Sequence, residues 1–147
     1  MSVRKMTVLI LVLAAFASGF IVRGFVVPSS IAHAQTVHRV FELRTYTAAP
    51  GKLDALKARF RDHTLKFFEK HGMTNVGYWV PQDAPLSENT LTYILAYPSR
   101  EAATKSWQAF RMDPEWLKAR AASEANGPLT TRTESLFLAP ADFSPMQ

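Results

Sequence analysis

The sequence has no cysteine, little glycine and none of the common glycine-rich phosphate-binding motifs. Without cysteine there is no disulfide framework, no thiolate metal site and no cysteine nucleophile. Gly72 and Gly77 have the spacing of P-loop glycines, but Tyr78-Trp79 follow where Lys and Ser or Thr are needed. A G-x-S-x-G nucleophile elbow is also missing. These absences exclude thiol chemistry and give no support to a nucleotide-binding loop or an α/β-hydrolase site.

The chain is also poor in basic charge once its N-terminus is set aside. Its 147 residues include 17 Lys+Arg and 12 Asp+Glu, a net charge of +5. Residues 1–34 contain Arg4, Lys5 and Arg23 and no acid, so residues 35–147 have a net charge of only +2. Binding to a nucleic-acid backbone needs clustered bases, and we therefore expect no nucleic-acid partner. The 48% hydrophobic content excludes a disordered chain.

Residues 1–34 have the three parts of a secretory signal peptide. A basic start is followed by the uncharged residues 6–22 and by the small-x-small tripeptide Ala32-His33-Ala34. We therefore predict a cleaved leader and an exported domain over residues 35–147, either periplasmic or secreted. The alternative is an uncleaved membrane anchor over residues 6–27, close to the roughly twenty apolar residues that span a bilayer. The domain would then be anchored and face outside.

Hydrophobic periodicity divides residues 35–147 into the strands and helices of one α+β domain. Alternation predicts strands, and helical spacing of apolar residues predicts helices. The expected order is strand 38–47, helix 52–71, strands 76–80 and 90–97, helices 101–110 and 113–125, and strand 131–138. This is the βαββαβ order of ferredoxin-like folds, in which right-handed crossovers place the helices on one face of the sheet. Apolar residues of both strand parities indicate that the other face is also covered, which predicts a homodimer joined sheet to sheet.

One histidine of the domain lies within a helical apolar stripe. His63 follows Phe60 by three residues and precedes Phe67 by four. It is interpreted as a hydrogen-bonded core histidine, as a ligand or general base in a cleft, or as an exposed residue at the edge of the stripe. His63 and His71 lie about 12 Å apart along one helix, too far to ligate one metal, and no metal site is expected.

Charged and aromatic residues of the strands are the candidates for a ligand site. Glu42 and Arg44 lie two apart on the first strand, and Arg132 and Glu134 repeat the arrangement on the last strand with the signs reversed. Cross-strand ion pairs are the simplest interpretation. An anion site at Arg44 or Arg132 is the alternative. The candidates for pocket walls, which also suit a core or an interface, are Tyr46, Tyr78, Trp79, Tyr93 and Tyr97.

Several short motifs together resemble the NIPSNAP family along about residues 39–139. They are Glu42-Leu43-Arg44-Thr45-Tyr46, Pro50-Gly51-Lys52-Leu53, Lys70-His71-Gly72, Val76-Gly77-Tyr78-Trp79 and Asp113-Pro114-Glu115-Trp116. The resemblance implies a dimeric α/β barrel made of two ferredoxin-like units. The tract from Tyr93 to Pro98 departs from the third strand usual in the family.

The resemblance implies no specific reaction, because NIPSNAP proteins share no generally established activity. Eukaryotic members are associated with mitochondria and vesicles, and fold relatives include cofactor-free monooxygenases of aromatic polyketides and haem-handling enzymes. We therefore expect a homodimer that binds a small apolar ligand or a protein partner, without a cofactor, through Arg44, Tyr46, Trp79 and Tyr93. The alternatives are a cofactor-independent monooxygenase-like enzyme with His63 as the base, and a haem protein with His63 as the axial ligand.

Overall fold

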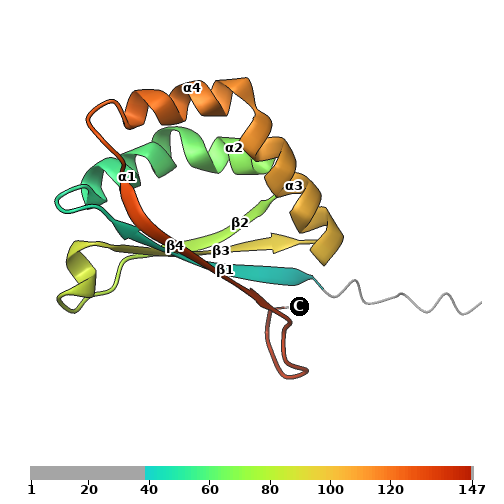
Figure 1. Cartoon of the computed structure of the whole chain (residues 1–147). Helices are drawn as coiled ribbons and strands as arrows, with labels where there is room; N and C mark the ends of the chain where they lie inside the picture. Colours follow the sequence, from blue (N-terminus) through green and yellow to red (C-terminus); the bar gives the residue numbers. More distant parts are fainter. Residues whose placement is uncertain (1–38, 147) are drawn as a thin grey trace, which may run out of the picture. The chain divides into compact units, whose positions relative to one another are not determined.

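The structure, a computed structural model, describes residues 39–146, a four-stranded sheet with helices on one side (Figure 1). The elements are β1 (Val40–Ala48), α1 (Leu53–Arg59), the π-helical turn η1 (Phe60–Thr64), α2 (Leu65–Lys70), β2 (Thr74–Trp79), the 3-10 turn η2 (Leu86–Glu88), β3 (Thr90–Tyr97), α3 (Arg100–Met112), α4 (Pro114–Ser123) and β4 (Thr130–Leu138). The predicted leader lies outside the described residues. Among residues 39–146, no helix has the length and apolarity to cross a bilayer.

The four strands form an antiparallel sheet in the order β2-β3-β1-β4. Both crossovers contain helices, and these helices cover the same face of the sheet (Figure 1). The predicted mixed α+β architecture and element order are therefore confirmed. Strand β2 begins two residues earlier than expected, because a register shift between Asn75 and Gly77 interrupts its alternation.

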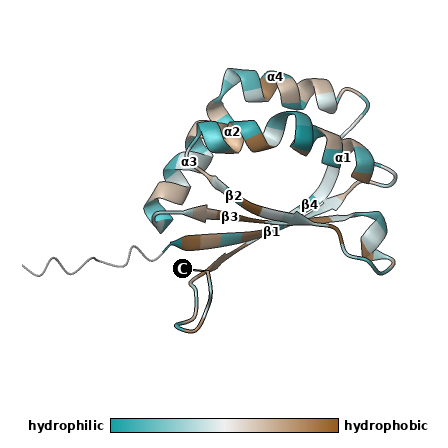
Figure 2. Cartoon of the chain, turned by 180° about the vertical axis from the view of Figure 1, so that it is seen from behind, coloured by the Kyte–Doolittle hydropathy of each residue, from teal (hydrophilic) through white to brown (hydrophobic). Residues whose placement is uncertain are grey.

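Alternation along β1 divides its side chains between the two faces of the sheet. Glu42 contacts Trp107 of α3, so Glu42, Arg44 and Tyr46 face the helices. Phe41 and Leu43 point to the opposite face, which we call the outer face. Hydrophobic and hydrophilic residues alternate along β1 (Figure 2), so that Phe41 and Leu43 lie on the outer face and the charged residues Glu42 and Arg44 on the inner one.

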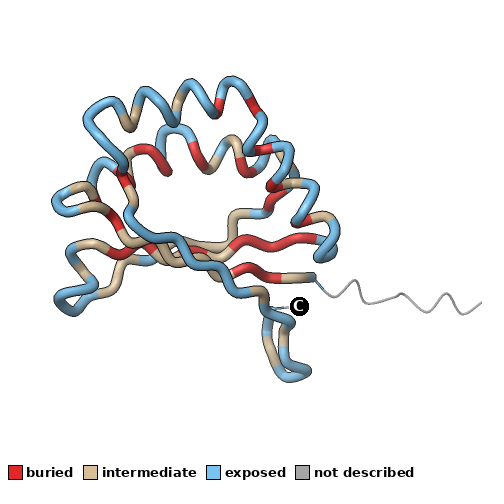
Figure 3. The backbone as a smooth tube through the Cα atoms, in the orientation of Figure 1, coloured by how far each residue is buried: buried red, intermediate tan, exposed pale blue. Residues whose placement is uncertain are grey.

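An aromatic core joins the helices to the sheet. Tyr93 of β3 is fully buried, and its ring contacts Phe60 at 5.2 Å and Phe68 at 5.9 Å between centroids. Phe68 in turn lies 5.5 Å from Trp107 of α3. Buried residues accordingly concentrate on β1, on β3 and on the helix sides that face them (Figure 3). These edge-on and stacked contacts fix the helices over the sheet.

The predicted long helix is interrupted by the π-helical turn η1, which changes the residues that face the sheet. In η1 the N–H of Leu65 donates to the carbonyl of Phe60, five residues back. The buried residues of this segment therefore recur every four positions, at Leu56, Phe60, Thr64 and Phe68. Thr64 occupies the position expected for His63, whose side chain is exposed. Of the three interpretations of His63, only exposure at the edge of the stripe fits the structure, because a π turn takes more residues than an α turn.

The predicted starts of the second helix pair are confirmed by their caps. The Ser99 side chain accepts the backbone N–H of Ala102 at 3.0 Å. The Asp113 carboxylate accepts the backbone N–H groups of Glu115 and Trp116, with Pro114 at the first helical position. Gly72 ends the first helical segment with φ of 76°, in the left-handed region that favours glycine.

The cross-strand ion pairs predicted between β1 and β4 do not form. Thr45 of β1 is opposite Glu134, and Arg44 is opposite Ser135. Arg44 and Glu134 therefore lie on opposite faces of the sheet. Each charged pair is formed within its own strand: Arg44 Nη1 lies 2.6 Å from Glu42, and Arg132 Nη2 lies 2.7 Å from Glu134. A register shifted by one residue would place Arg44 and Glu134 on the same face.

The outer face of the sheet is partly apolar and only partly covered by the chain itself. The side chains of Leu136 and Trp79 are 58% and 51% exposed there. The segment after β4 folds over the same side of the sheet, opposite the helices (Figure 1). It covers Phe41 and leaves a cavity of about 400 Å³, while its own Phe143 is 88% exposed. A large apolar surface of this kind is typical of an interface.

Candidate functional site

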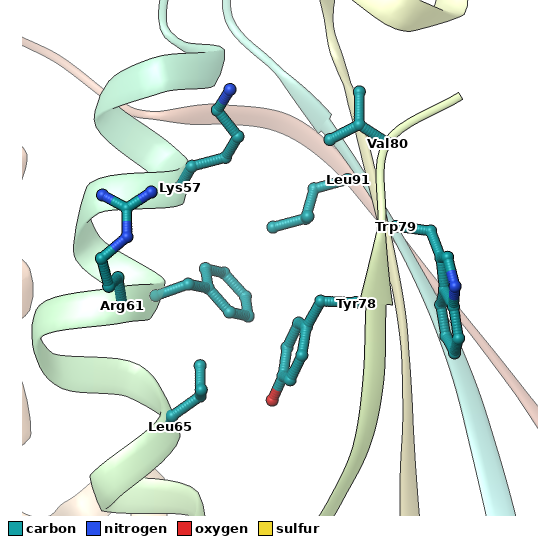
Figure 4. A pocket seen from close by; sticks show the side chains of 8 residues that line it. Lys57, Arg61, Leu65, Tyr78, Trp79, Val80 and Leu91 are labelled. Atoms are coloured by element: carbon teal, nitrogen blue, oxygen red, sulfur yellow. The ribbon is translucent and has the colours of Figure 1, made fainter. Parts of the chain in front are cut away.

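Several hollows lie between the sheet and the helices of the described residues, and the first is apolar. It is formed where α1, η1 and α2 approach β2 and β3, and it has a volume of about 270 Å³ (Figure 4). We call it the apolar cavity; its lining residues are Lys57, Phe60, Arg61, Leu65, Tyr78, Trp79, Val80 and Leu91. The Trp79 ring points away from its centre, to the far side of β2 (Figure 4). The walls are therefore made by aliphatic side chains and by the rings of Phe60 and Tyr78.

Two basic side chains stand at the rim of the apolar cavity. Lys57 forms an ion pair with Asp54 at 2.7 Å, so its charge is balanced within the same helix. Arg61, one turn further along, is exposed to solvent. The Tyr78 hydroxyl donates to the side-chain oxygen of Asn75. The interior of the cavity thus offers apolar surface and few free polar groups.

The second hollow lies nearer β4, between the sheet and helices α3 and α4, and contains several arginines. Its volume is about 360 Å³. We call it the arginine cleft; its lining residues are Arg44, Tyr46, Arg59, Trp107, Phe110, Arg111, Trp116, Arg120, Glu124, Thr130 and Thr133. The ring of Phe60 contacts Tyr46 on this side and Tyr78 on the other, both at 5.8 Å between centroids. A wall of aromatic rings therefore separates the two hollows.

A buried carboxylate network fixes the arginine in this cleft. Glu42 is 1% exposed and accepts four side-chain donors. They are Tyr97 Oη and Trp107 Nε1, both at 2.7 Å, Ser135 Oγ at 2.5 Å, and Arg44 Nη1 at 2.6 Å. The Arg44 guanidinium also lies 4.2 Å from the Trp107 ring. Arg44 is thus held by a salt bridge on one side and an indole on the other.

Burial and these hydrogen bonds determine the direction in which the pKa of each buried group is shifted. Burial by itself raises the pKa of Glu42, but the hydrogen bonds from Ser135, Trp107 and Tyr97, together with Arg44, outweigh it and lower the pKa below 4.5. Burial raises the pKa of Tyr78 and of Tyr93 well above the ordinary value of 10.0. Glu42 therefore stays charged and both phenols stay protonated near neutral pH, so none of them is a ready general base or acid.

The structure brings some of the predicted site residues together and separates others. Arg44 and Tyr46 line the arginine cleft, and Tyr93 lies against Tyr46 with 5.3 Å between ring centroids. Trp79 lies on the outer face instead, over Gly77. His63 lines neither hollow. Within residues 39–146 there is also no group of three or more His, Cys, Asp or Glu side chains placed to hold a metal ion.

Several residues of the arginine cleft were not candidates from the sequence. Arg59, Trp107, Arg111 and Trp116 come from three different helices. A signal was available in α3, where Trp107, Phe110 and Arg111 recur at helical spacing. This spacing shows that one face of the helix is aromatic and carries an arginine. It does not indicate which strand that face contacts.

Comparison with protein families identifies the chain. The NIPSNAP family model matches residues 41–145. The chain belongs to the NIPSNAP family. Its α+β fold with an antiparallel four-stranded sheet is similar to that of solved NIPSNAP structures. A comparison with curated proteins finds no match.

Solved NIPSNAP structures support the same assignment. A NIPSNAP family protein of unknown function from Agrobacterium tumefaciens is 25% identical with a TM-score of 0.66, covering 76% of this chain and 96% of that one. A NIPSNAP-like domain protein from Burkholderia xenovorans is 22% identical with a TM-score of 0.64, covering 74% and 90%. A monooxygenase from Streptomyces coelicolor, solved with nanaomycin D, is 15% identical with a TM-score of 0.51, covering 71% and 89%. The last two show similarity of fold alone.

The NIPSNAP motifs of this chain meet in the structure. Lys70 Nζ and His71 Nε2, from the end of the first helical segment, each lie 2.8 Å from the Asp113 carboxylate that caps α4. The hydrogen bond from Lys70 is the main cause that holds the pKa of Asp113 far below its usual range. Lys70-His71-Gly72 and Asp113-Pro114-Glu115-Trp116 therefore form one junction between helices, while Glu42 and Arg44 form the network beneath the arginine cleft.

Proposed function

We propose that this NIPSNAP protein is an exported homodimer that binds a small, largely apolar ligand in the apolar cavity. The observation that carries the proposal is the cavity itself, a hollow of about 270 Å³ with aliphatic and aromatic walls. Ligand sites are typically concave and mostly apolar, with a few polar groups that fix orientation. Burying apolar wall and ligand surface together is favourable by about 25 cal/mol per Å².

The polar groups around the cavity favour a ligand with an uncharged body. The Tyr78 hydroxyl is bound to Asn75, and Lys57 is paired with Asp54. A polar atom deep in the ligand would leave water without gaining a free partner. Ligands with a polar group at one end are accommodated only with that end at the rim, near Arg61.

Filling the cavity is expected to abolish binding of a neutral apolar fluorophore, N-phenyl-1-naphthylamine. Leu65 lines the cavity and is only half-buried, so Leu65→Trp places an indole in the hollow without disturbing the closed core. We expect the affinity for the fluorophore to fall about tenfold or more, because ligand and indole compete for one volume. Fluorescence titration at equal protein concentration measures the change.

The matched control introduces the same side chain elsewhere on the helical layer. Leu117 of α4 is 46% exposed and lines neither hollow. Leu117→Trp should bind the fluorophore as the unmodified protein does. Equal binding by Leu65→Trp and the unmodified protein would contradict the proposal.

Export is supported by the sequence of residues 1–34, with its basic start, apolar stretch and Ala-x-Ala end. When the full chain is expressed with its own leader, we expect intact-mass spectrometry to give a mature protein beginning at Gln35. A start at Met1 or Ser2 would contradict cleavage. Recovery of that longer species in the membrane fraction would favour the anchor alternative.

The proposed homodimer is supported by the outer face of the sheet. This face carries the exposed side chains of Leu136, Leu138 and Trp79. Two charged residues of β4, Arg132 and Glu134, neutralise each other within the same strand. A nearly neutral apolar face is compatible with a second copy of itself, as a two-fold interface requires.

A further inference from the structure

The arginine cleft contains two arginines, Arg59 buried and Arg44 largely buried, whose donors are not all used. Arg59 is 6% exposed, and its Nη1 donates to Glu124 at 2.8 Å. Arg44 donates through Nη1 to Glu42. In both arginines the buried Nε–H has no hydrogen-bond partner within the described part of the chain. A buried N–H without an acceptor is costly, so two of them in the walls of one hollow show that donors outnumber acceptors there.

The residues that line the cleft have a positive net charge. Four arginines and a single carboxylate, Glu124, line it. Arg59 and Arg120 both bind Glu124, at 2.8 and 3.2 Å. Arg111 forms no ion pair among residues 39–146 and lies 5.6 Å from the Trp107 ring. The cleft therefore has excess positive charge in a setting where part of it is shielded from water.

The cleft is suited to an anion by its charge. Aromatic rings form the rest of its walls, and they indicate which class of anion would fit. Tyr46, Trp107, Phe110 and Trp116 all line the hollow. Phe110 and Trp116 lie 4.5 Å apart between centroids and form one continuous surface. Flat rings and guanidinium planes favour a planar apolar body that carries a carboxylate. The hollow of about 360 Å³ has room for a molecule of one or two rings.

We propose that the arginine cleft is a binding site for a small aromatic carboxylate, distinct from the apolar cavity. The carboxylate accepts from the buried arginines and is steered by Arg111, and the ring packs between Tyr46 and the α3–α4 aromatic surface. The proposal is independent of the apolar ligand above, because different residues carry it. The aromatic carboxylate can fail to bind in the arginine cleft while the apolar ligand still binds in the apolar cavity, and the reverse.

The test is calorimetric titration with 2-naphthoate and with its neutral analogue 2-naphthamide. We expect 2-naphthoate to bind about tenfold or more tightly than the amide, and less tightly as salt is raised, since charge-assisted hydrogen bonds are about twice as strong as neutral ones. Arg59→Gln removes a buried donor, and Arg120 still pairs with Glu124. Arg111→Gln removes an exposed charge without disturbing the core. Each should weaken 2-naphthoate about tenfold.

Arg61→Gln is the discriminating control, because Arg61 stands at the rim of the apolar cavity. It should leave 2-naphthoate binding unchanged, while Arg111→Gln should leave the neutral fluorophore unchanged. If Arg59→Gln fails to fold, Arg111→Gln decides the question. The proposal is overturned by no measurable 2-naphthoate binding, by equal binding of the amide, or by a loss in Arg61→Gln as large as in Arg111→Gln. It is also overturned if inorganic phosphate displaces 2-naphthoate at equal concentration, which would indicate a phosphate site.

Discussion

Replacing Glu42 by glutamine is expected to lower the free energy of unfolding by about 3–5 kcal/mol, the usual cost of breaking a buried ion pair. Four donors point at this carboxylate, and its partner Arg44 is only 12% exposed. The amide of glutamine brings two donors of its own into a site already filled with donors. It also leaves the Arg44 charge without a counter-ion. Urea denaturation followed by circular dichroism measures the loss.

The same substitution at Glu134 is the matched control. Glu134 also pairs with an arginine two residues away on its strand, but both side chains are more than half exposed. Glu134→Gln should cost about 1 kcal/mol or less. Since Arg44 and Glu134 lie on opposite faces, the effects of Arg44→Ala and Glu134→Ala should add within about 0.5 kcal/mol. If Glu42→Gln proves as mild as Glu134→Gln, the buried network does not stabilise the fold as described.

The contribution of Glu42 should depend on pH in a defined direction. Its pKa in the folded protein is below the ordinary 4.5, so near that pH the unfolded chain binds more protons than the folded one. The stability due to Glu42 is complete above about pH 4.5 and is lost as the pH falls through the lowered pKa. The difference in unfolding free energy between the unmodified protein and Glu42→Gln should therefore shrink between pH 7 and pH 3. Other acids of the chain titrate in both proteins and cancel in this difference.

The element order could be predicted because each element has its own local signal. Ser99 and Asp113 cap helices whatever they pack against, and Gly72 ends one because its backbone is left-handed there. Local signals do not determine the register between strands. The pairing of Arg44 with Ser135 depends on contacts along the whole of β1 and β4, and an error of one residue exchanges the faces.

His63 illustrates a different limit. Its spacing from Phe60 and Phe67 fits an α-helix, but the segment contains a π turn that exposes His63 and buries Thr64. The turn allows Leu56, Phe60 and Phe68 to remain on one line over the sheet. The π turn is stabilised by this packing of the helix against the sheet, and helical periodicity in the sequence does not predict it.

Of the residues that line the arginine cleft, only those on strands were candidates from the sequence. Arg44 and Tyr46, which line the arginine cleft, were candidates as charged and aromatic residues of a strand, and so was Trp79, which lies on the outer face. Arg59 and Trp107 reach the same cleft from helices, and Trp107 is 65 residues from its hydrogen-bond partner Glu42. Only the fold brings them together, so no local pattern distinguishes Arg59 from other basic residues of its helix.

Introducing a charge at Leu136 is expected to convert the proposed homodimer into a monomer. Leu136 is 58% exposed on the outer face of the single chain, so Leu136→Arg should not impair folding. In a two-fold interface the new charge occurs twice, and each buried unpaired charge costs several kcal/mol, which corresponds to a loss of affinity of several orders of magnitude. Native mass spectrometry and sedimentation at micromolar concentration would show twice the chain mass for the unmodified protein and the single mass for the variant.

Leu117→Arg provides the comparison, because Leu117 is 46% exposed on α4, in the helical layer rather than on the outer face. It should remain dimeric, which would show that the effect of Leu136→Arg is local to the outer face and is not due to added charge. A dimer that survives Leu136→Arg would place the interface elsewhere. Dissociation by Leu117→Arg instead would place the interface on the helical layer.

The apolar cavity and the arginine cleft both lie on the helix-facing side of the sheet, so a monomeric Leu136→Arg variant should retain both hollows. Its ligand affinities would show whether each site is complete in one chain.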